Sequence, residues 1–242
     1  MKQTALITGA SKRIGKALTE HLAQQGWNVA VHFNSSEKSA NELVTSLSAK
    51  YPKQIFASFQ TNLAEISEVE KLIPNVISAF GNIDLLINNA SVFDASYVKE
   101  TSVELFDSQF NVNLKGPFFL VRDFANLCKS GIIINFVDTR VTSNKSNFAA
   151  YSLSKKALWE LTKMAALELA PNIRVNAIAP GVTLPPDDKD ENYLQNLAQN
   201  IPMKKPGGVE PIIKSLDFIL ENNHVTGQLL FADGGENLGQ NA

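Results

Sequence analysis

Two residues that together could act as an acid–base pair lie four positions apart, at Tyr151 and Lys155. If this segment is helical, the two side chains share one face, because residues four apart are neighbours on a helix surface. A phenol, with a pKa of about 10, is a poor acid or base at neutral pH. A nearby ammonium group favours the phenolate, so the spacing predicts that Lys155 lowers the pKa of Tyr151.

A glycine-containing turn near the N-terminus could bind a phosphate group. It runs Thr8-Gly9-Ala10-Ser11-Lys12-Arg13-Ile14-Gly15 and joins a short apolar stretch to a segment of helical period. Glycines at such a turn let the backbone approach a pyrophosphate, and the helix N-terminus supplies N–H groups and a partial positive charge. Because Arg13 occupies the place of a middle glycine in the common GxGxxG pattern, a plain strand–helix turn is the alternative.

The end of the second apolar stretch favours NADPH over NADH. Folds that select NAD usually place a carboxylate there for the ribose 2′-hydroxyl, whereas here Phe33 is followed by Asn34-Ser35-Ser36. A 2′-phosphate would meet hydroxyls and amides, with Arg13 close enough to pair with it. The alternative is that these residues cap the next helix, and one residue can do both.

Polar turns also follow the third and fourth apolar stretches. Asn62-Leu63 offers an amide that could contact adenine, and Asn88-Asn89-Ala90 forms a turn that lets the chain pass under a cofactor. Adjacent asparagines after a strand are also common in simple turns. The interpretation of this turn as part of a cofactor site therefore depends on the other motifs.

Apolar runs of strand length alternate with segments of helical period along the whole chain. The predicted strands are 4–8, 28–33, 54–59, 83–88, 132–137, 173–178 and 228–231, and the predicted helices are 13–25, 37–50, 67–80, 103–129 with an interruption at Gly116-Pro117, 149–169 and 210–220. Ser67 and Glu70 fit a capping box at the start of the third helix. Strands that are apolar on both faces predict a parallel sheet covered by helices on each side. We therefore predict an α/β fold with a doubly wound parallel sheet, in a single domain spanning residues 1–242.

The composition excludes several classes of protein. The chain has 242 residues, with 22 Lys and Arg against 24 Asp and Glu and a formal net charge of -2. Without an excess of cations there is no reason to expect a nucleic-acid or membrane-surface partner, and no apolar run reaches the roughly 18 residues of a membrane span. The single cysteine, Cys128, can form no internal disulfide and suits a reducing compartment. We expect a cytoplasmic protein without a metal ion.

The motifs, in this order, resemble those of the short-chain dehydrogenase/reductase family over essentially the whole chain. They are the turn from Thr8 to Gly15, Asn88-Asn89-Ala90, Asn113 within Asn-Val-Asn-Leu, Tyr151 with Lys155, Pro180-Gly181 and Asp233-Gly234-Gly235. The resemblance implies a Rossmann-like fold and a nicotinamide cofactor, here NADPH. It also implies Tyr151 as the catalytic acid–base, Lys155 as the group that lowers its pKa and holds the nicotinamide ribose, and Asn113 as support for a proton-relay water.

The residues expected to contact the cofactor follow from these motifs. They are Gly9, Ser11, Lys12, Arg13, Ile14, Asn34, Ser35, Ser36, Asn62, Leu63, Asn89, Ala90, Ser91, Tyr151, Lys155, Pro180 and Gly181.

One position departs from the family pattern. Most members have a serine thirteen residues before the tyrosine, which donates a hydrogen bond to a substrate carbonyl, but this chain has Asp138 there. An ionised carboxylate only accepts hydrogen bonds, so it would oppose a developing alkoxide. It suits a nitrogen heterocycle that carries N–H donors or, if protonated, it can give a proton to an imine nitrogen. The alternatives are an aspartate that only caps the loop, or a serine role taken over by Thr139 or Ser143.

Asp138, together with Tyr151 and Lys155, resembles the pteridine reductase branch of the family, which includes dihydromonapterin reductases. The other matches are Lys12-Arg13, the segment Asn88-Asn89-Ala90-Ser91-Val92-Phe93, Ala170-Pro171 and Arg174-Val175-Asn176, whereas His32 and Ser35 match only in part. In that branch the arginine contacts cofactor phosphate and pterin, and the phenylalanine stacks on the pterin ring. Aromatic stacking contributes about 0.5–1.5 kcal/mol beyond area burial. The expected substrate-binding residues are Arg13, Ser91, Phe93, Asp138, Tyr151, Pro180 and Gly181.

These observations lead to the hypothesis of an NADPH-dependent pteridine reductase, which reduces a dihydropterin, an oxidised pterin or dihydrofolate to the tetrahydro form. A ketone or 3-oxoacyl-carrier-protein reductase of the same family is the alternative, since it shares every motif except Asp138. An alternative of another class is a non-catalytic protein that senses NADP. The intact Asn113, Tyr151 and Lys155 argue against it.

Two further segments carry expectations about the substrate and the assembly. The stretch from Pro180 to Asn192 is polar and proline-rich, so we expect no core element there and a flexible substrate lid at about 181–200. The predicted helix 149–169 is apolar around much of its circumference, which one sheet face cannot bury alone. We expect a contact between subunits there, and the family resemblance suggests a homotetramer.

Overall fold

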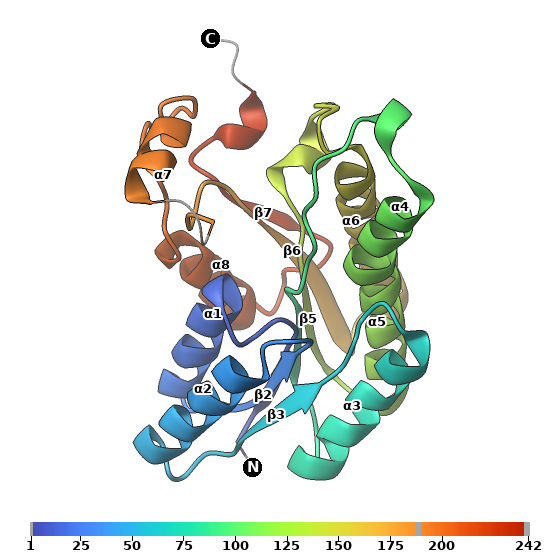
Figure 1. Cartoon of the computed structure of the whole chain (residues 1–242). Coiled ribbons are helices and arrows are strands. Elements are labelled where there is room, and N and C mark those ends of the chain that lie inside the picture. Colours follow the sequence, from blue (N-terminus) through green and yellow to red (C-terminus); the bar gives the residue numbers. More distant parts are fainter. Residues whose placement is uncertain (1, 187–189, 240–242) are drawn as a thin grey trace.

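The protein is built around one seven-stranded parallel sheet. The computed structural model describes residues 2–186 and 190–239, and within them the strands lie in the order β3-β2-β1-β4-β5-β6-β7 (Figure 1). Every neighbouring pair is parallel. The strands are β1 (Thr4–Ile7), β2 (Asn28–Phe33), β3 (Phe56–Gln60), β4 (Leu85–Asn88), β5 (Gly131–Phe136), β6 (Ile173–Pro180) and β7 (Leu229–Ala232).

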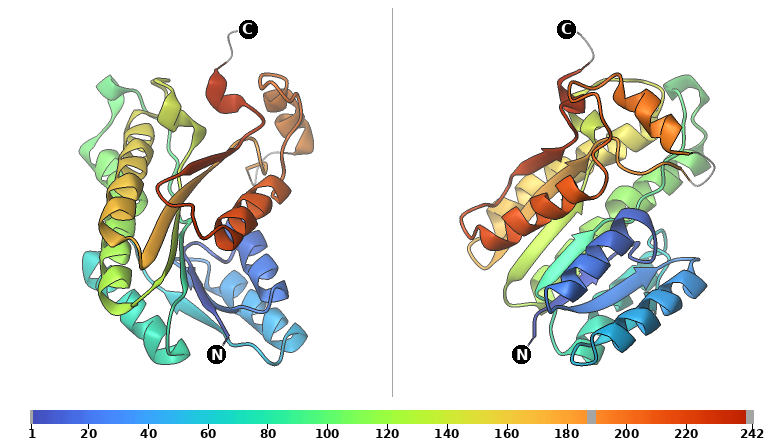
Figure 2. Two further views of the ribbon diagram at one scale, coloured as in Figure 1. Left: turned by 180° about the vertical axis from the view of Figure 1, so that it is seen from behind. Right: turned by 90° about the vertical axis from the view of Figure 1, so that its left-hand side faces the viewer.

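Helices cover both faces of this sheet, as Figure 2 shows from two sides. They are α1 (Arg13–Gln24), α2 (Glu37–Lys50), α3 (Ile66–Phe80), α4 (Val103–Phe110), α5 (Gly116–Leu127), α6 (Ala149–Leu169), α7 (Glu191–Ala198) and α8 (Glu210–Glu221). Shorter helical turns are η1 (Val98–Glu100), η2 (Asn111–Lys115), η3 (Thr139–Thr142) and η4 (Glu236–Leu238). Buried side chains of α1, α2 and α8 form one core with the sheet, and those of α3, α5 and α6 form the core on the other face.

The strands are apolar on both faces because neither face meets solvent. On β4, Leu86 belongs to the core beneath α3, α5 and α6, whereas Ile87 belongs to the core beneath α1, α2 and α8. On β5, Ile133 and Ile134 divide in the same way. Successive side chains of a strand point to opposite faces, so this apolar pattern requires two helix layers. Cys128 is buried in the core beneath α3, α5 and α6, as a small core residue.

The predicted α/β fold with a Rossmann-like, doubly wound parallel sheet is confirmed. Each predicted strand and helix is present, and its ends differ from the prediction by at most two residues. Among the described residues, none of the helices combines the length and the apolar character that crossing a membrane requires.

Three local predictions were wrong. Gly116-Pro117 does not interrupt the long helical stretch, because α4 continues through the π-helical turn η2 into α5, with Pro117 in the first turn of α5. The capping box at Ser67 does not form, since Glu65 holds the N-cap position of α3 and makes no side-chain capping bond. The irregular stretch expected up to residue 192 gives way to α7 at residue 191, after residues 187–189, which lie outside the described residues.

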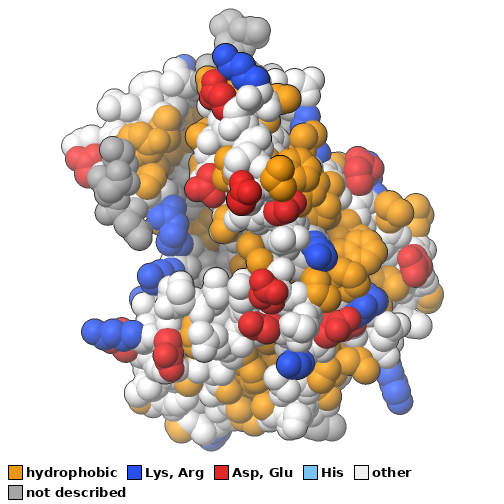
Figure 3. All heavy atoms as spheres, turned by 45° about the vertical axis from the view of Figure 1, so that its right-hand side comes forward, with side chains coloured by type: hydrophobic (Ala, Val, Ile, Leu, Met, Phe, Trp, Pro, Cys, Tyr) orange, Lys and Arg blue, Asp and Glu red, His pale blue; other side chains and the backbone are white. Residues whose placement is uncertain are grey.

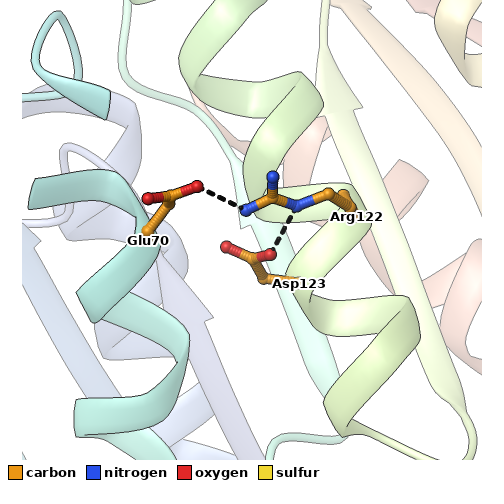
Figure 4. A network of polar contacts seen from close by, with 3 residues as sticks. All are labelled: Glu70, Arg122 and Asp123. Carbon is orange, nitrogen blue, oxygen red and sulfur yellow. Dashed lines mark hydrogen bonds and ion pairs between the residues drawn. The ribbon is translucent and has the colours of Figure 1, made fainter. Parts of the chain in front are cut away.

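An ion-pair network links α3 and α5 on the outer surface of their layer (Figure 4). The guanidinium of Arg122 donates from Nη2 to Glu70 at 3.1 Å and from Nε to Asp123 at 2.7 Å. Arg122 also lies over the ring of Phe119, at 4.6 Å from its centroid. The network thus joins α5 to α3 through the Arg122–Glu70 pair.

The buried His32 on β2 ties together the loops that follow β1 and β3. Its Nδ1 accepts the N–H of Gly9 at 3.0 Å, and its Nε2 lies 3.0 Å from the carbonyl of Thr61. A carbonyl only accepts, so Nε2 carries the proton and the ring is neutral. Burial lowers the pKa of His32 to about 4, although the hydrogen bond to Thr61 works in the opposite direction.

This histidine predicts a loss of stability in mild acid. Between pH 6.5 and about 4 the unfolded chain binds a proton at His32 that the folded chain does not, so the free energy of unfolding falls as the pH falls through this window. The full effect is about 3 kcal/mol. Denaturant unfolding at pH 7 and at pH 4.5 measures it in the wild type and in His32→Asn, which keeps an acceptor near Gly9 but does not titrate. We expect a smaller loss in the variant, and equal losses in both proteins would contradict the assignment.

Candidate active site

A cavity of about 340 Å³ opens at the carboxyl ends of the central strands, where the strand order reverses between β1 and β4. Such a reversal is where open α/β sheets bind their ligands. Of the residues predicted from sequence, Arg13, Ile14, Asn89, Ser91, Phe93, Asp138, Tyr151, Lys155, Pro180 and Gly181 line it. The cavity is also lined by Phe136, Val137, Thr183 and Leu184, which were not predicted. Their nearness in sequence to Asp138 and Gly181 was the one available signal.

Asp138 and Tyr151 face each other in this cavity. Asp138 follows β5, Tyr151 lies in the first turn of α6, and the tyrosine hydroxyl donates to Oδ2 of the carboxylate at 2.7 Å. The other carboxylate oxygen, Oδ1, accepts the N–H of Arg140 at 2.8 Å and so caps η3. Asp138 is therefore both a cap and the partner of Tyr151. Thr139 and Ser143, the alternative hydroxyls, do not line the cavity.

The environment of Tyr151 keeps its phenol protonated. Burial raises the pKa of Tyr151 well above its ordinary value of 10, and the charge and hydrogen bond of Asp138 raise it further. Arg140 and the hydroxyl of Ser91 act in the opposite direction. The carboxylate of Asp138 bonds the hydroxyl directly, and the predicted lowering of this pKa by Lys155 stays a prediction. In this environment the Tyr151 hydroxyl is a hydrogen-bond donor to Asp138.

Lys155 lies one turn further along α6 and is fully buried. Its Nζ donates to the carbonyl of Phe136 at 2.8 Å and lies 5.9 Å from the centroid of the Tyr151 ring. Burial lowers the pKa of Lys155 to about 8, against the charge of Asp138, which raises it. The hydrogen bond to Phe136 is the one that Lys155 makes among the described residues, so its other N–H groups are available to a ligand in the cavity.

Phe93 presents an exposed aromatic ring at the cavity. It is 53% exposed, although large apolar side chains are usually covered. One face stacks on Phe148 with ring centroids 4.2 Å apart, and Tyr151 packs edge to face against Phe93 at 4.5 Å. The guanidinium of Arg140 lies over the Phe148 ring at 4.6 Å. Phe148 was not predicted, because only the bridge between Ser96 and Phe148 brings it beside Phe93.

Asn113 lies behind the cavity and not on its surface. It is fully buried in η2, and its amide bonds Ser91, Val92, Gln109 and Ser154. Its side chain thus holds the segment that carries Phe93. The predicted support of a proton-relay water by Asn113 stays a prediction.

Arg13 and Lys12 are the two cations of the glycine-containing turn. The Arg13 guanidinium donates to the carbonyls of Leu184 and Pro185, in the segment after β6. Arg13 thus reaches from the turn to the segment after β6, and its predicted pairing with a 2′-phosphate stays a prediction. Lys12 lies with Ser11 in a second cavity of about 590 Å³ between α1 and α2. Arg13 lines this second cavity as well, so both cations of the turn border the space between α1 and α2.

The turn itself fits a dinucleotide phosphate. Helix α1 begins without a side-chain cap at Lys12, so the first N–H groups of the helix are available to an anion. Gly9 has a φ of +63°, and a Cβ on Gly15 would lie 2.1 Å from the Gly9 carbonyl oxygen and 2.7 Å from Nδ2 of Asn89. Both glycines are therefore required by the close passage of the β1 and β4 ends.

Gly15→Ala is expected to weaken NADPH binding by about fivefold to 150-fold, because overpacking of this kind costs about 1–3 kcal/mol. Titration of the intrinsic protein fluorescence with NADPH measures the dissociation constant. Gly207→Ala is the matched control, since a Cβ there meets its nearest atom at 3.6 Å. An unchanged dissociation constant in Gly15→Ala would show that this turn does not bind the cofactor.

The remaining predicted cofactor contacts lie at the same edge of the sheet. Asn34, Ser35 and Ser36 follow β2, and Ser36 is the N-cap of α2 without a side-chain capping bond, so capping does not occupy its hydroxyl. Asn62 and Leu63 follow β3, where Asn62 Oδ1 accepts the N–H of Ala64 at 3.1 Å and Leu63 is buried. The N–H of Ala90, after β4, donates to Thr8 Oγ1 at 3.0 Å. None of these six lines the 340 Å³ cavity.

Comparison with known proteins agrees with this architecture. The 3-oxoacyl-[acyl-carrier-protein] reductase FabG of Staphylococcus epidermidis is 32% identical over 243 residues, covering 97% of this chain and 99% of that protein. The structure of FolM alternative dihydrofolate reductase 1 from Brucella suis in complex with NADP has a TM-score of 0.93 at 33% identity and covers 99% of this chain and 97% of that one. A blue fluorescent protein from a metagenomic library, in complex with NADPH, has a TM-score of 0.88 at 27% identity and covers 96% and 97%.

The sequence pattern of one family extends over most of the chain. The pattern described as short chain dehydrogenase matches residues 3–194, which include the glycine-containing turn, Asp138, Tyr151 and Lys155. The chain therefore belongs to the short chain dehydrogenase family of oxidoreductases.

Proposed function

We propose that this protein is an NADPH-dependent pteridine reductase that reduces a ring C=N bond of a dihydropterin or an oxidised pterin. The observation that carries the proposal is the carboxylate of Asp138, which lies in the cavity and accepts the Tyr151 hydroxyl at 2.7 Å. A carboxylate cannot donate to a carbonyl oxygen, whereas it can accept N–H groups of a pterin. The Brucella proteins, whose structures are described as alternative dihydrofolate reductases with NADP, support the same substrate class at 33% identity.

NADPH is the proposed cofactor, and the turn from Gly9 to Gly15 with Lys12 and Lys155 is the proposed site that holds it. When bound, NADPH supplies the hydride that adds to the ring carbon. The solved structures similar to this one contain NADP or NADPH. The absence of a carboxylate at Asn34 to Ser36 favours a cofactor with a 2′-phosphate.

Tyr151 is the proposed donor of the proton that the adjacent ring nitrogen takes up. Its raised pKa keeps the phenol protonated at neutral pH. A weak acid suffices, because a ring nitrogen that has gained the electron pair of a C=N bond is a strong base. Asp138 orients the hydroxyl and accepts substrate N–H groups, and the proton passes directly or through a water. Phe93 offers its exposed ring to the pterin, and Arg13 closes the cavity from the side of Leu184.

The alternative within the family is a ketone or 3-oxoacyl-carrier-protein reductase, which the 32% identity to the staphylococcal enzyme supports. Rates of NADPH consumption with 7,8-dihydrobiopterin and with a β-ketoester, measured side by side, distinguish the two. We expect a kcat/KM at least about 100-fold higher for the dihydropterin, the size of effect that one polar catalytic group produces. A higher kcat/KM for the β-ketoester would overturn the proposal. NADPH binding without consumption of either compound would favour a sensing protein.

The proposed substrate lid covers residues 181–200. Its described part contains Thr183 and Leu184 at the cavity, the carbonyls that Arg13 bonds, and α7. Residues 187–189 of the lid lie outside the described residues. Through these bonds of Arg13, the lid is connected to the glycine-containing turn.

The proposed assembly is a homotetramer that uses the face of α4, α5 and α6. Figure 3 shows hydrophobic side chains gathered on this face. Phe118, Met164 and Leu167 are 48%, 65% and 85% exposed there, and a groove of about 320 Å³ lies between α5 and α6. We expect Leu167→Glu to dissociate the assembly, because it places a charge in a buried apolar contact. Sedimentation equilibrium tests this, and a monomeric wild type would refute the assembly.

A further inference from the structure

A buried glutamine that no part of the mechanism uses connects the Phe93 segment to the catalytic helix. Gln109 lies in α4 with none of its surface exposed. Its Nε2 donates to Asp94 Oδ2 at 2.8 Å, and its Oε1 accepts Nδ2 of Asn113 at 3.1 Å. A buried amide that lacks partners is costly, so the two bonds determine where this side chain lies.

The same network holds the backbone on both sides of Phe93. On one side, Val92 donates its N–H to Asn113 Oδ1 and accepts Asn113 Nδ2 at its carbonyl, both at 2.9 Å. On the other side, Asp94 is bonded to Gln109. Among the described residues, Phe93 itself makes ring contacts and no hydrogen bond, and its side chain is half exposed. The orientation of its ring therefore depends on the two flanking residues.

The network also reaches the catalytic helix. Asn113 Nδ2 lies 3.2 Å from Ser154 Oγ, and the Ser154 hydroxyl donates to the carbonyl of Tyr151 at 2.7 Å. Asn113 and Ser154 are fully buried. A continuous chain of hydrogen bonds through the buried Asn113 and Ser154 thus connects the segment that carries Phe93 to the helix that carries Tyr151. Buried networks of this kind rigidify the groups they join.

We propose that Gln109 is a positioning residue for the substrate, which acts through Asp94 and Asn113 to fix Phe93 relative to Tyr151. This inference rests on the proposed function, because it takes Phe93 as the ring on which the substrate stacks. Gln109 touches neither the cavity nor the reacting atoms. Its loss should therefore raise the KM for the pterin more than it lowers kcat.

Asp94 is the exposed end of this network, so it can be substituted without a change in the core. Asp94→Ala removes the acceptor of Gln109 from an exposed position, and Asp94→Asn retains an oxygen acceptor there. Asp107→Ala is the matched control, because Asp107 is an exposed acid of the same helix as Gln109 with no side-chain hydrogen bond among the described residues. Gln109→Leu removes the whole connection, and its folding is checked by circular dichroism.

Two readouts separate this inference from the proposed function. Hydrogen exchange of the peptide that covers residues 91–95 needs no substrate, and we expect Asp94→Ala and Gln109→Leu to exchange about threefold to tenfold faster than wild type, the effect of one lost hydrogen bond. With 7,8-dihydrobiopterin we expect the KM to rise by a similar factor, with kcat and the NADPH dissociation constant within about twofold. Asp94→Asn should resemble wild type in both.

Unchanged exchange and KM in Asp94→Ala, or equal changes in Asp107→Ala, would overturn the positioning role. If the wild type reduces a β-ketoester and no pterin, the proposed function fails. The exchange data and the KM for the β-ketoester then decide the positioning role by the same criteria.

Discussion

Tyr151→Phe is expected to lower kcat for 7,8-dihydrobiopterin by about 10²- to 10⁴-fold, the contribution of a positioned acid or base. The substitution removes the hydroxyl that donates to Asp138 and retains the ring that packs against Phe93. The carboxylate then has no proton donor at 2.7 Å, and the ring nitrogen must take its proton from water. Steady-state consumption of NADPH measures the effect.

The control for this variant is Tyr97→Phe, since Tyr97 is 48% exposed and its hydroxyl makes no hydrogen bond within the described residues. We expect wild-type kinetics from it. The NADPH dissociation constant should stay within about twofold in both variants, since the hydroxyl acts on the substrate. A Tyr151→Phe protein with the wild-type kcat would mean that another group supplies the proton.

Asp138→Ser is expected to reverse the substrate preference. It should lower kcat/KM for the dihydropterin by about 100-fold or more and raise it for a β-ketoester, because a hydroxyl donates to a developing alkoxide where a carboxylate repels it. Parallel assays of the two substrates measure the ratio.

Asp138→Asn separates this chemistry from the capping role of the same side chain. Asparagine keeps a carbonyl oxygen for the N–H of Arg140, so η3 keeps its cap. It replaces the acceptor that faces Tyr151 with an N–H donor. We expect Asp138→Asn to lose pterin reduction with an unchanged melting temperature. Pterin reduction at the wild-type rate in both Asp138 variants would show that the carboxylate has only a structural role.

The sheet and the order of its motifs could be predicted because their signals are local in the sequence. Strands β4 and β5 are short apolar runs that carry Leu86 and Ile133 to one core and Ile87 and Ile134 to the other, and only a two-layered parallel sheet hides both faces. The glycine-containing turn and the Tyr–Lys spacing are likewise local. The position of Asp138 after β5 then placed it beside Tyr151.

The features that escaped prediction arise from contacts between distant segments. The pKa of Tyr151 rises because the phenol is buried and because it bonds Asp138, thirteen residues earlier. Spacing within one helix could reveal neither effect. Phe148 stacks on Phe93 across a bridge between two loops. In the sequence, Gln109 is an ordinary polar residue of a predicted helix, and only the structure shows that its side chain bonds Asp94.

The central claim is that Asp138 turns a carbonyl site into a site for a ring C=N bond. A crystal structure of the ternary complex with NADPH and a dihydropterin tests it most directly. We expect N–H groups of the pterin within hydrogen-bond distance of the Asp138 carboxylate, the ring stacked on Phe93, and the ring nitrogen of the C=N bond facing the Tyr151 hydroxyl. A pterin bound elsewhere, or an Asp138 carboxylate turned away from it with a neighbouring hydroxyl in its place, would contradict the claim.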